Sequence, residues 1–230
     1  MKKILVCEDE DAIREFVVIN LRRSGYEVRD VSSGEDALAV FEREGGQFHV
    51  ALLDVMLPGI DGFAVCKKLR ELSSTLGIIM LSAKSQEMDK VNGLMLGADD
   101  YVTKPFSPSE LVARVDAVVR RVSLLSAAPQ QEEALVSGPF VLNLRSRTLT
   151  KNGDPIELTQ VEFHLMKLFL KNVNTALERS ELLRQVWGDN GSDVKVVDVN
   201  IRRLRMKVED DPSTPNYITT VWGYGYRWKA

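Results

Sequence analysis

The 230-residue sequence predicts an α/β domain built on a five-stranded, doubly wound parallel sheet, followed by a smaller α+β domain. Short apolar runs alternate with amphipathic helical patterns over residues 1–121. Residues 122–134 break this pattern with small and polar side chains and a proline, as a linker does. Residues 135–230 join apolar–polar alternation to helical patterns, which is typical of a separate α+β domain.

The first domain takes its strands from five apolar runs that are separated by helical patterns. Apolar residues recur at helical spacing over residues 13–21, 88–95 and 111–119. Gly25 and Gly97 stand where helices are expected to end. Strands that alternate with helices predict a parallel sheet covered on both faces. The strands are expected at Ile4–Cys7, Tyr26–Val31, Val50–Leu53, Ile78–Leu81 and Tyr101–Val102.

The second domain begins with a stretch that predicts hairpin strands and then two helices. Residues 138–158 alternate apolar and polar side chains around a turn at 152–155. Thr159 precedes Glu162 by three residues, which predicts a capping box at the start of a helix over 158–172. A second helix is expected at roughly Arg179–Trp187.

A third helix over 193–210 combines an apolar face with a basic one. The buried face is expected at Val197, Ile201, Leu204 and Val208, which follow 4-3-4 spacing. A solvent-exposed charged face would be the simplest interpretation of the remaining side chains. Residues 217–228 favour another, because they predict a strand, a glycine-rich turn and a second strand. A helix-turn-helix followed by a hairpin is a winged helix. The second helix of that helix-turn-helix, here the helix over 193–210, enters the DNA major groove. The side chains off the apolar stripe are Lys195, Asn200, Arg202, Arg203 and Arg205.

Composition restricts the class of protein. Hydrophobic residues make up 44% and charged residues 27%, as in a soluble globular protein. No apolar run reaches membrane-spanning length and no cleavage site follows the N-terminus, so we expect a cytoplasmic protein without a membrane partner. Cys7 and Cys66 are expected to be reduced thiols. His49 and His164 lie far apart without ligands at metal spacing, which argues against zinc.

The formal charge of −3 is unevenly distributed. Counted along the sequence, residues 1–121 carry −4, residues 122–134 carry −2 and residues 135–230 carry +3. An acidic domain joined to a mildly basic one suggests that the two bind different partners.

Polar side chains follow four of the five predicted strands. Glu8 and Asp9 follow the first strand, Asp54 the third, Ser82 the fourth and Lys104 the fifth. Any one of them could be a turn or cap residue, but the carboxyl ends of parallel strands converge, so they are expected together. Clustered carboxylates repel one another unless a cation joins them, and hard oxygen ligands favour Mg²⁺. Asp54 could then accept a phosphoryl group, with lysine and hydroxyl binding its oxygens.

The first 121 residues resemble a two-component response-regulator receiver domain. The resemblance rests on "ILVCEDE" (4–10), "LLDVMLPGIDG" (52–62), "MLSA" (80–83) and "GADDYVTKPF" (97–106). It implies that a sensor histidine kinase phosphorylates Asp54, and that Ser82 and Tyr101 form a switch pair. It also implies that Glu8, Asp9, Asp54 and the main-chain carbonyl of Met56 hold Mg²⁺. Phosphorylation is expected to drive a homodimer in which Lys90 pairs with Glu110, Asp100 with Arg114, and Asp99 with Arg121.

Residues 135–230 resemble the winged-helix effector domain of OmpR/PhoB-type transcription factors. The matching segments are "LTQVEF", "RSELLRQVWG", "VVDVNIRRLRMKVEDDP" and "YITTVWGYGYRW". The resemblance implies that the five polar side chains off the third helix's apolar stripe contact promoter DNA. It also implies that the loop around 187–193 touches RNA polymerase. Asn200 and Trp222 depart from the family pattern, which often has histidine and a basic residue there. We favour packing of Trp222 over the wing, against neighbours such as Tyr224, and contact with DNA stays open.

These features predict a phosphorylation-dependent transcription regulator that is not an enzyme beyond its own phosphotransfer and dephosphorylation. A phosphatase of the haloacid dehalogenase kind needs a second acid two residues after its nucleophile, where this chain has Met56. A phosphorylation-independent regulator, with the first domain serving only for dimerisation, remains the alternative. Its hallmark would be loss of an acidic or lysine position, and all are present.

Overall fold

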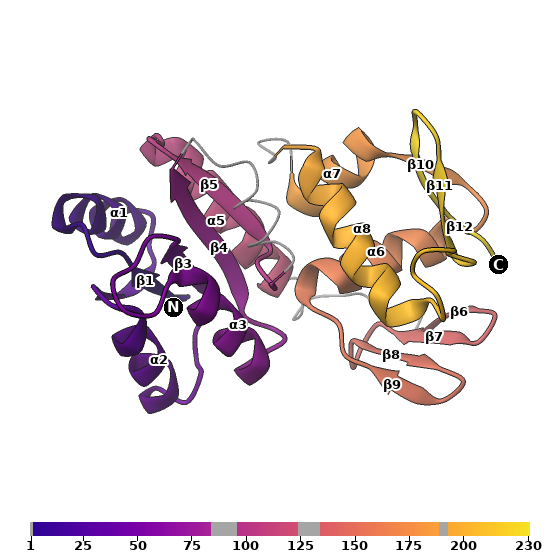
Figure 1. Ribbon diagram of the computed structural model, residues 1–230, viewed down its shortest axis with the longest axis horizontal. Helices are drawn as coiled ribbons and strands as arrows, with labels where there is room; N and C mark the ends of the chain where they lie inside the picture. Colours follow the sequence, from indigo (N-terminus) through magenta and orange to yellow (C-terminus); the bar gives the residue numbers. More distant parts are fainter. Residues whose placement is uncertain (1, 84–95, 124–133, 189–192) are drawn as a thin grey trace. The chain divides into compact units, whose positions relative to one another are not determined.

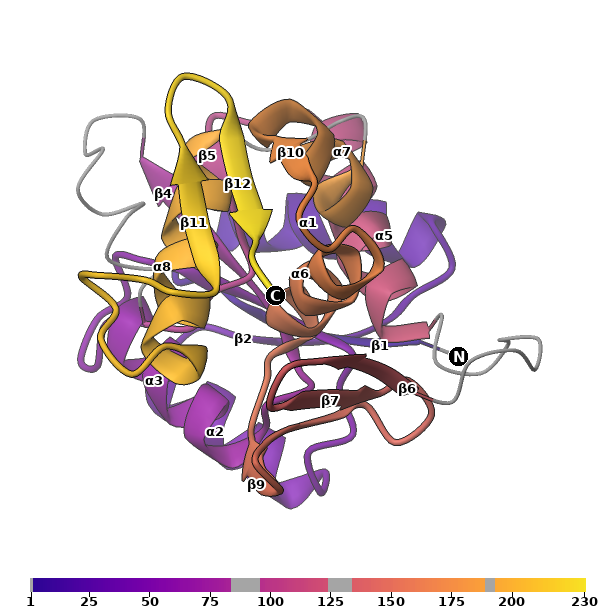
Figure 2. The same ribbon diagram turned by 90° about the vertical axis from the view of Figure 1, so that its right-hand side faces the viewer.

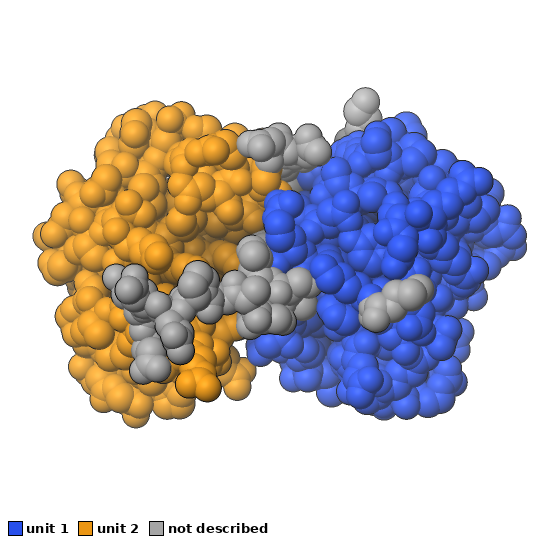
Figure 3. Space-filling model, turned by 180° about the vertical axis from the view of Figure 1, so that it is seen from behind, with its two compact units in different colours: residues 1–123 blue, residues 124–230 orange. Residues whose placement is uncertain are grey.

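The computed structural model describes residues 2–83, 96–123, 134–188 and 193–230, without the side chains of 121–123. The chain divides into two compact units, Met1–Ser123 and Leu124–Ala230 (Figure 3). The helix expected over 88–95 lies entirely outside the described residues, and most of the expected linker also lies outside them. Each unit is described below by itself.

Unit 1 contains the predicted parallel sheet, with strand order β2-β1-β3-β4-β5 (Figure 1). Every neighbouring pair is parallel, and all of β3 is buried, as its apolar run predicts. Asp54 and Lys104 are the last residues of their strands, and Ser82 precedes the last residue of β4. These three residues therefore lie within the carboxyl ends of their strands, whereas Glu8 and Asp9 follow β1 as predicted. The strands are β1 (Lys3–Cys7), β2 (Glu27–Val31), β3 (Val50–Asp54), β4 (Gly77–Ala83) and β5 (Asp100–Lys104).

Helices cover both faces of this sheet. α1 and α5 pack on one face, where Val17, Leu21 and Val115 join the alternate residues of the strands in one core. α2 and α3 lie together on the opposite face (Figure 1). Ser33 caps α2, and Asp61 caps α3 by accepting the amide of Ala64. The described helices of unit 1 are α1 (Asp11–Arg23), α2 (Gly34–Arg43), α3 (Gly62–Leu72) and α5 (Pro108–Ser123).

Unit 2 is the predicted α+β domain, and its described residues form three helices and two antiparallel sheets. The helices are α6 (Gln160–Lys171), α7 (Arg179–Trp187) and α8 (Lys195–Val208). The expected hairpin is part of a four-stranded sheet, β6 (Ala134–Ser137), β7 (Phe140–Asn143), β8 (Thr148–Lys151) and β9 (Asp154–Ile156). The second sheet contains β10 (Ala176–Glu178), β11 (Ile218–Val221) and β12 (Gly225–Trp228) in the order β10-β12-β11. The β11–β12 hairpin is the wing and stands beside α8 (Figure 2).

An aromatic cluster joins the two sheets of unit 2. The ring centroids of Phe140 and Trp228 lie 5.2 Å apart, and Tyr217 lies 4.8 Å from Phe140. The indole N–H of Trp228 donates to Ser137 Oγ at 2.9 Å, so the polar end of this buried ring is satisfied. These contacts fix the base of the wing to the domain core.

Candidate functional sites

Three carboxylates form an acidic pocket at the carboxyl ends of β1 and β3. One oxygen each of Glu8, Asp9 and Asp54 lies within 4.8 Å of the other two. Asp9 is exposed, whereas Glu8 is 0% and Asp54 4% exposed. Glu8 and Asp54 are therefore buried, and Asp9 is the member of the cluster that faces solvent. The structure brings together the three side chains that sequence spacing suggested.

Lys104 joins two of these carboxylates. Its Nζ lies 3.0 Å from Asp54 Oδ2 and 2.8 Å from Glu8 Oε2. The following Lys104–Pro105 peptide bond is cis, which sequence alone does not reveal. A buried carboxylate is costly unless it is paired, and this lysine supplies the pairing.

The surroundings of the pocket shift the protonation of its neighbours. Burial raises the pKa of Glu8 to about 7, with Asp54 adding to the rise and Lys104 opposing it. Burial and the charge of Asp54 also raise the pKa of Cys7 to about 12. The Cys7 thiol is fully buried and donates to the carbonyl of Ser33 at 3.2 Å. Cys7 is therefore a small buried hydrophobe, which argues against a redox role.

Ser82 and Tyr101, the expected switch pair, lie on the neighbouring strands β4 and β5. Ser82 is 3% exposed, and within the described residues no hydrogen-bond partner reaches its buried Oγ. An unpaired buried hydroxyl is costly, and a ligand oxygen placed nearby would satisfy it. Tyr101, the other member of the expected pair, is also buried.

Two residues that support the pocket were not predicted. Arg14 of α1 donates to the carbonyls of Glu8 at 2.8 Å and Asp9 at 3.3 Å, which fixes the loop after β1. A Cβ at Gly62 would lie 1.9 Å from the carbonyl oxygen of Asp54, so no other residue fits without moving the backbone. The Asp61-Gly62 pair at the start of α3 was a possible signal for Gly62. Arg14 resembles any charged residue on a helix surface.

The donor set of the pocket suits a hard divalent cation. Carboxylate oxygens are the ligands that Mg²⁺ prefers, and the exposed Asp9 leaves one side of the site open to water. Lys104 balances part of the negative charge without occupying all carboxylate oxygens, because its described contacts are to Glu8 and Asp54. The residues present therefore fit the ion.

The polar side chains of α8 divide into exposed and buried groups. Lys195 and Arg202 are exposed, as expected for DNA contacts. Asn200 is 0% and Arg203 5% exposed, which contradicts the expectation that they contact DNA. The Asn200 amide donates to the carbonyl of Val196 at 2.9 Å and its oxygen accepts from Arg203 at 3.2 Å. Both side chains are therefore structural.

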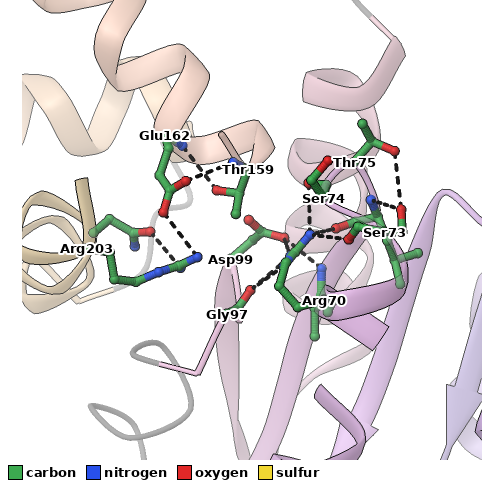
Figure 4. A network of polar contacts seen from close by, with 12 residues as sticks. Arg70, Ser73, Ser74, Thr75, Gly97, Asp99, Thr159, Glu162 and Arg203 are labelled. Carbon is green, nitrogen blue, oxygen red and sulfur yellow. Dashed lines mark hydrogen bonds and ion pairs between the residues drawn. The ribbon is translucent and has the colours of Figure 1, made fainter. Parts of the chain in front are cut away.

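Arg203 belongs to a buried ionic cluster with α6 (Figure 4). Glu162 is fully buried, and its carboxylate lies 3.3 Å from Arg203 and 2.6 Å from Lys207. The same carboxylate accepts the amide of Thr159 at 2.8 Å, which completes the predicted capping box. Burial favours the neutral form of Glu162, but Arg203 and Lys207 outweigh it and hold the pKa below its usual range. The cluster ties the start of α6 to α8.

Arg205 and Trp222 also differ from expectation. Arg205 is half-buried. Its Nε donates to the carbonyl of Ile218 at 2.9 Å, and its Nη2 donates to Thr220 Oγ1 at 2.9 Å. It therefore holds the wing against α8 in place of reaching outward. Trp222 is 91% exposed, so the expected packing of its ring over the wing is wrong.

The residues expected at a dimer interface are largely paired within unit 1. Arg114 lies 3.0 Å from Glu110 and 3.4 Å from Asp100. Asp99 is fully buried, and it accepts the amide of Ile78 and the guanidinium of Arg70 (Figure 4). Its burial contradicts the expected contact with Arg121 of a second copy. Lys90 and the Arg121 side chain lie outside the described part of the chain.

Comparison with known proteins assigns both units. Residues 4–116 match the family described as "Response regulator receiver domain". Residues 153–228 match the family described as "Transcriptional regulatory protein, C terminal". An acidic pocket on a parallel sheet, joined to a winged helix, thus defines the class of two-component transcription regulators.

The chain belongs to the response-regulator family and is homologous to RegX3 and to OmpR/PhoB-type regulators such as DrrB. It is 43% identical to the sensory transduction protein RegX3 of Mycolicibacterium smegmatis, over 99% of each chain. Among solved structures, a RitR mutant is 26% identical with a TM-score of 0.75, over 99% of each chain. DrrB, an OmpR/PhoB homologue of Thermotoga maritima, is 33% identical with a TM-score of 0.51, over 100% of each chain. The family implies a histidine kinase partner, DNA binding and phosphorylation-dependent regulation of transcription.

Proposed function

We propose that Asp54 is the phosphoacceptor and that Glu8, Asp9, Asp54 and the main-chain carbonyl of Met56 hold Mg²⁺. The observation that carries this proposal is the position of Lys104 Nζ, 3.0 Å from Asp54 Oδ2 and 2.8 Å from Glu8 Oε2. A cation at this point can transfer its contact from the carboxylate to a phosphoryl oxygen once Asp54 is modified. The Ser82 hydroxyl, which has no hydrogen-bond partner among the described residues, provides a second hydrogen bond to that group.

The reaction moves one phosphoryl group between two side chains. An Asp54 carboxylate oxygen forms the new P–O bond as the P–N bond of a phosphohistidine on the kinase breaks, and the imidazole nitrogen takes up a proton. Mg²⁺ held by Glu8, Asp9 and Asp54 would neutralise charge on the transferring phosphoryl oxygens. Arg14 holds the Glu8–Asp9 backbone, and Lys104 stabilises the product acyl phosphate. We propose no activity beyond this transfer and the later hydrolysis of the phosphoaspartate.

The output is transcription control by unit 2. Phosphorylation, sensed by Ser82 and Tyr101, promotes a homodimer through the β5–α5 face, where Asp100, Glu110 and Arg114 exchange partners within and between copies. The dimer binds promoter DNA with Lys195 and Arg202, and the loop over 187–193 contacts RNA polymerase. We place this regulator in the cytoplasm, with a linker at 122–134 between its domains. Among the described residues, no helix is long and apolar enough to cross a membrane.

The direct test is phosphorylation by a small-molecule donor. The full chain is incubated with acetyl phosphate and MgCl₂, and intact mass spectrometry should show one added phosphoryl group. Asp54→Asn should abolish it, and excess EDTA should suppress it, because the ion is needed to offset charge. Asp154→Asn, an exposed change in β9, is the matched control and should leave the modification intact. Equal modification of the Asp54→Asn chain would overturn the assignment.

A further inference from the structure

Trp222 occupies the tip of the wing with its indole in solvent. It is 91% exposed, more than any other large apolar residue in the described chain. The amide of Tyr224 donates to the carbonyl of Val221 at 3.0 Å, and Gly223 has φ +71°, so a tight turn presents the ring. Tyr224 beside it is 46% exposed. Two aromatic side chains therefore face outward at one point.

The wing that carries Trp222 is fixed to α8. The Tyr226 hydroxyl donates to Asp198 Oδ1 of α8 at 2.7 Å. The guanidinium carbons of Arg179 and Arg205 lie 4.8 Å and 5.5 Å from the centroid of the Tyr226 ring. A Cβ at Gly225 would lie 2.0 Å from the carbonyl of Leu177, so the hairpin backbone packs directly on β10. The exposed tip is thus held at a defined position relative to α8 and its exposed residues Lys195 and Arg202.

The charged residues around the wing indicate which kind of partner binds at its tip. Lys195 and Arg202 are exposed on α8, and Arg227 is exposed on β12. Residues 212–230 contain Arg227 and Lys229 but no Asp or Glu. A surface with this composition complements a polyanion, and this family binds DNA. A helix in the major groove places an adjacent hairpin over the flanking sugar–phosphate backbone.

We propose that Trp222 is a DNA contact that acts without charge, with its indole against the deoxyribose and base edges beside the groove that α8 enters. Apolar side chains make such contacts by packing on sugars or wedging at base steps. A basic residue at this position would instead release counterions. This chain therefore gains wing affinity that depends little on salt. The inference rests on the DNA-binding function.

Fluorescence quenching tests the contact directly, because Trp187 is 2% and Trp228 0% exposed. Acrylamide should therefore quench mainly Trp222 in the free protein. The probe is a DNA duplex selected from a random-sequence library by the phosphorylated full chain. Saturating amounts of this duplex should remove the accessible fraction, and Trp222→Phe should show little quenching in either state. Trp222 that stays equally quenchable in the saturated complex would overturn the inference.

Salt titration of the same complex supplies the second measurement. Trp222→Ala should weaken binding about tenfold with an unchanged slope of log K against log salt, since stacking on nucleic acid is uncharged. Trp222→Arg should steepen that slope by roughly one unit. Val136→Ala, a change at a 67% exposed position in β6, is the control and should bind as wild type. Wild-type affinity of Trp222→Ala also contradicts the inference, whereas failure to enrich any duplex would overturn the DNA-binding function itself.

Discussion

At the residue scale, the pocket depends on side chains whose identity the sequence revealed and whose environment it did not. Glu8, Asp54 and Lys104 were predictable, because the ends of parallel strands converge at one edge of a sheet. The depth of Asp54 was not, since burial depends on the loops that close over the strand ends. The close approach of Gly62 is a long-range backbone contact, and sequence periodicity carries no information on it.

Gly62→Ala tests how closely the backbone around Asp54 is fitted. The new methyl group would meet the carbonyl oxygen of Asp54 at 1.9 Å and its carbonyl carbon at 2.8 Å, both unable to rotate away. We expect a loss of roughly 1–3 kcal/mol in stability, as for an overpacked core, and slower phosphorylation by acetyl phosphate. Calorimetry and intact mass measure the two effects.

Gly25→Ala is the matched control, because Gly25 has φ +86° but no atom within 4 Å of an added Cβ. It should cost about 1–2 kcal/mol through the left-handed conformation alone and leave the phosphorylation rate unchanged. Equal phosphorylation rates in both variants would show that the Gly62 contact does not position Asp54.

At the element scale, α8 shows where helical periodicity succeeds and where it stops. Val197, Ile201, Leu204 and Val208 are all buried, as their spacing predicts. Asn200 and Arg203 flank this stripe, and α6 covers that flank with the Glu162 carboxylate. Sequence reveals the centre of a buried face but not its width, which is set by the neighbouring helix. A buried arginine therefore resembled a DNA contact.

Adjacent arginines of α8 provide a matched pair of substitutions. Arg203→Ala should lower stability by about 3–5 kcal/mol, because it leaves the buried Glu162 with one fewer cation. Arg202→Ala should leave stability within about 0.5 kcal/mol and weaken DNA binding. Urea unfolding followed by tryptophan fluorescence reports on this unit, since all three tryptophans lie in it. Full stability of Arg203→Ala would refute the structural role.

The Glu162 cluster also predicts a dependence of stability on pH. Arg203 and Lys207 hold the pKa of Glu162 below its ordinary value of 4.5, despite burial, so the folded state binds its proton less readily than the unfolded state. This contribution is therefore present above about pH 4.5 and is lost as pH falls through the folded pKa. Glu162→Gln should be less stable at pH 7, and should lose less stability between pH 6 and pH 4 than wild type. Parallel losses in urea unfolding would contradict this linkage.

At the scale of the whole molecule, two kinds of surface share one chain, and the charge distribution of the sequence already separated them. The acidic half contains the pocket and the basic half contains the winged-helix domain. The coupling between the two units was not predictable from the sequence. Asp99, Asp100 and Arg114, which were expected to pair across a dimer, already form ion pairs within one chain. A dimer must therefore exchange existing ion pairs. The side chains of Asp100 and Arg114 are 3% and 12% exposed, so an exchange must keep both charges paired, because an unpaired buried charge is costly.

The central claim is that phosphorylation of Asp54 controls binding of DNA by unit 2. One preparation is divided, one half is treated with acetyl phosphate and MgCl₂, and both are titrated with the selected duplex while light scattering records their mass. The phosphorylated half should be dimeric and should bind the duplex roughly tenfold tighter or more, in the usual range of coupling between two sites. Asp54→Asn should show neither change. A treated wild-type sample that carries the phosphoryl group, stays monomeric and binds DNA no tighter would contradict the account and favour a phosphorylation-independent regulator.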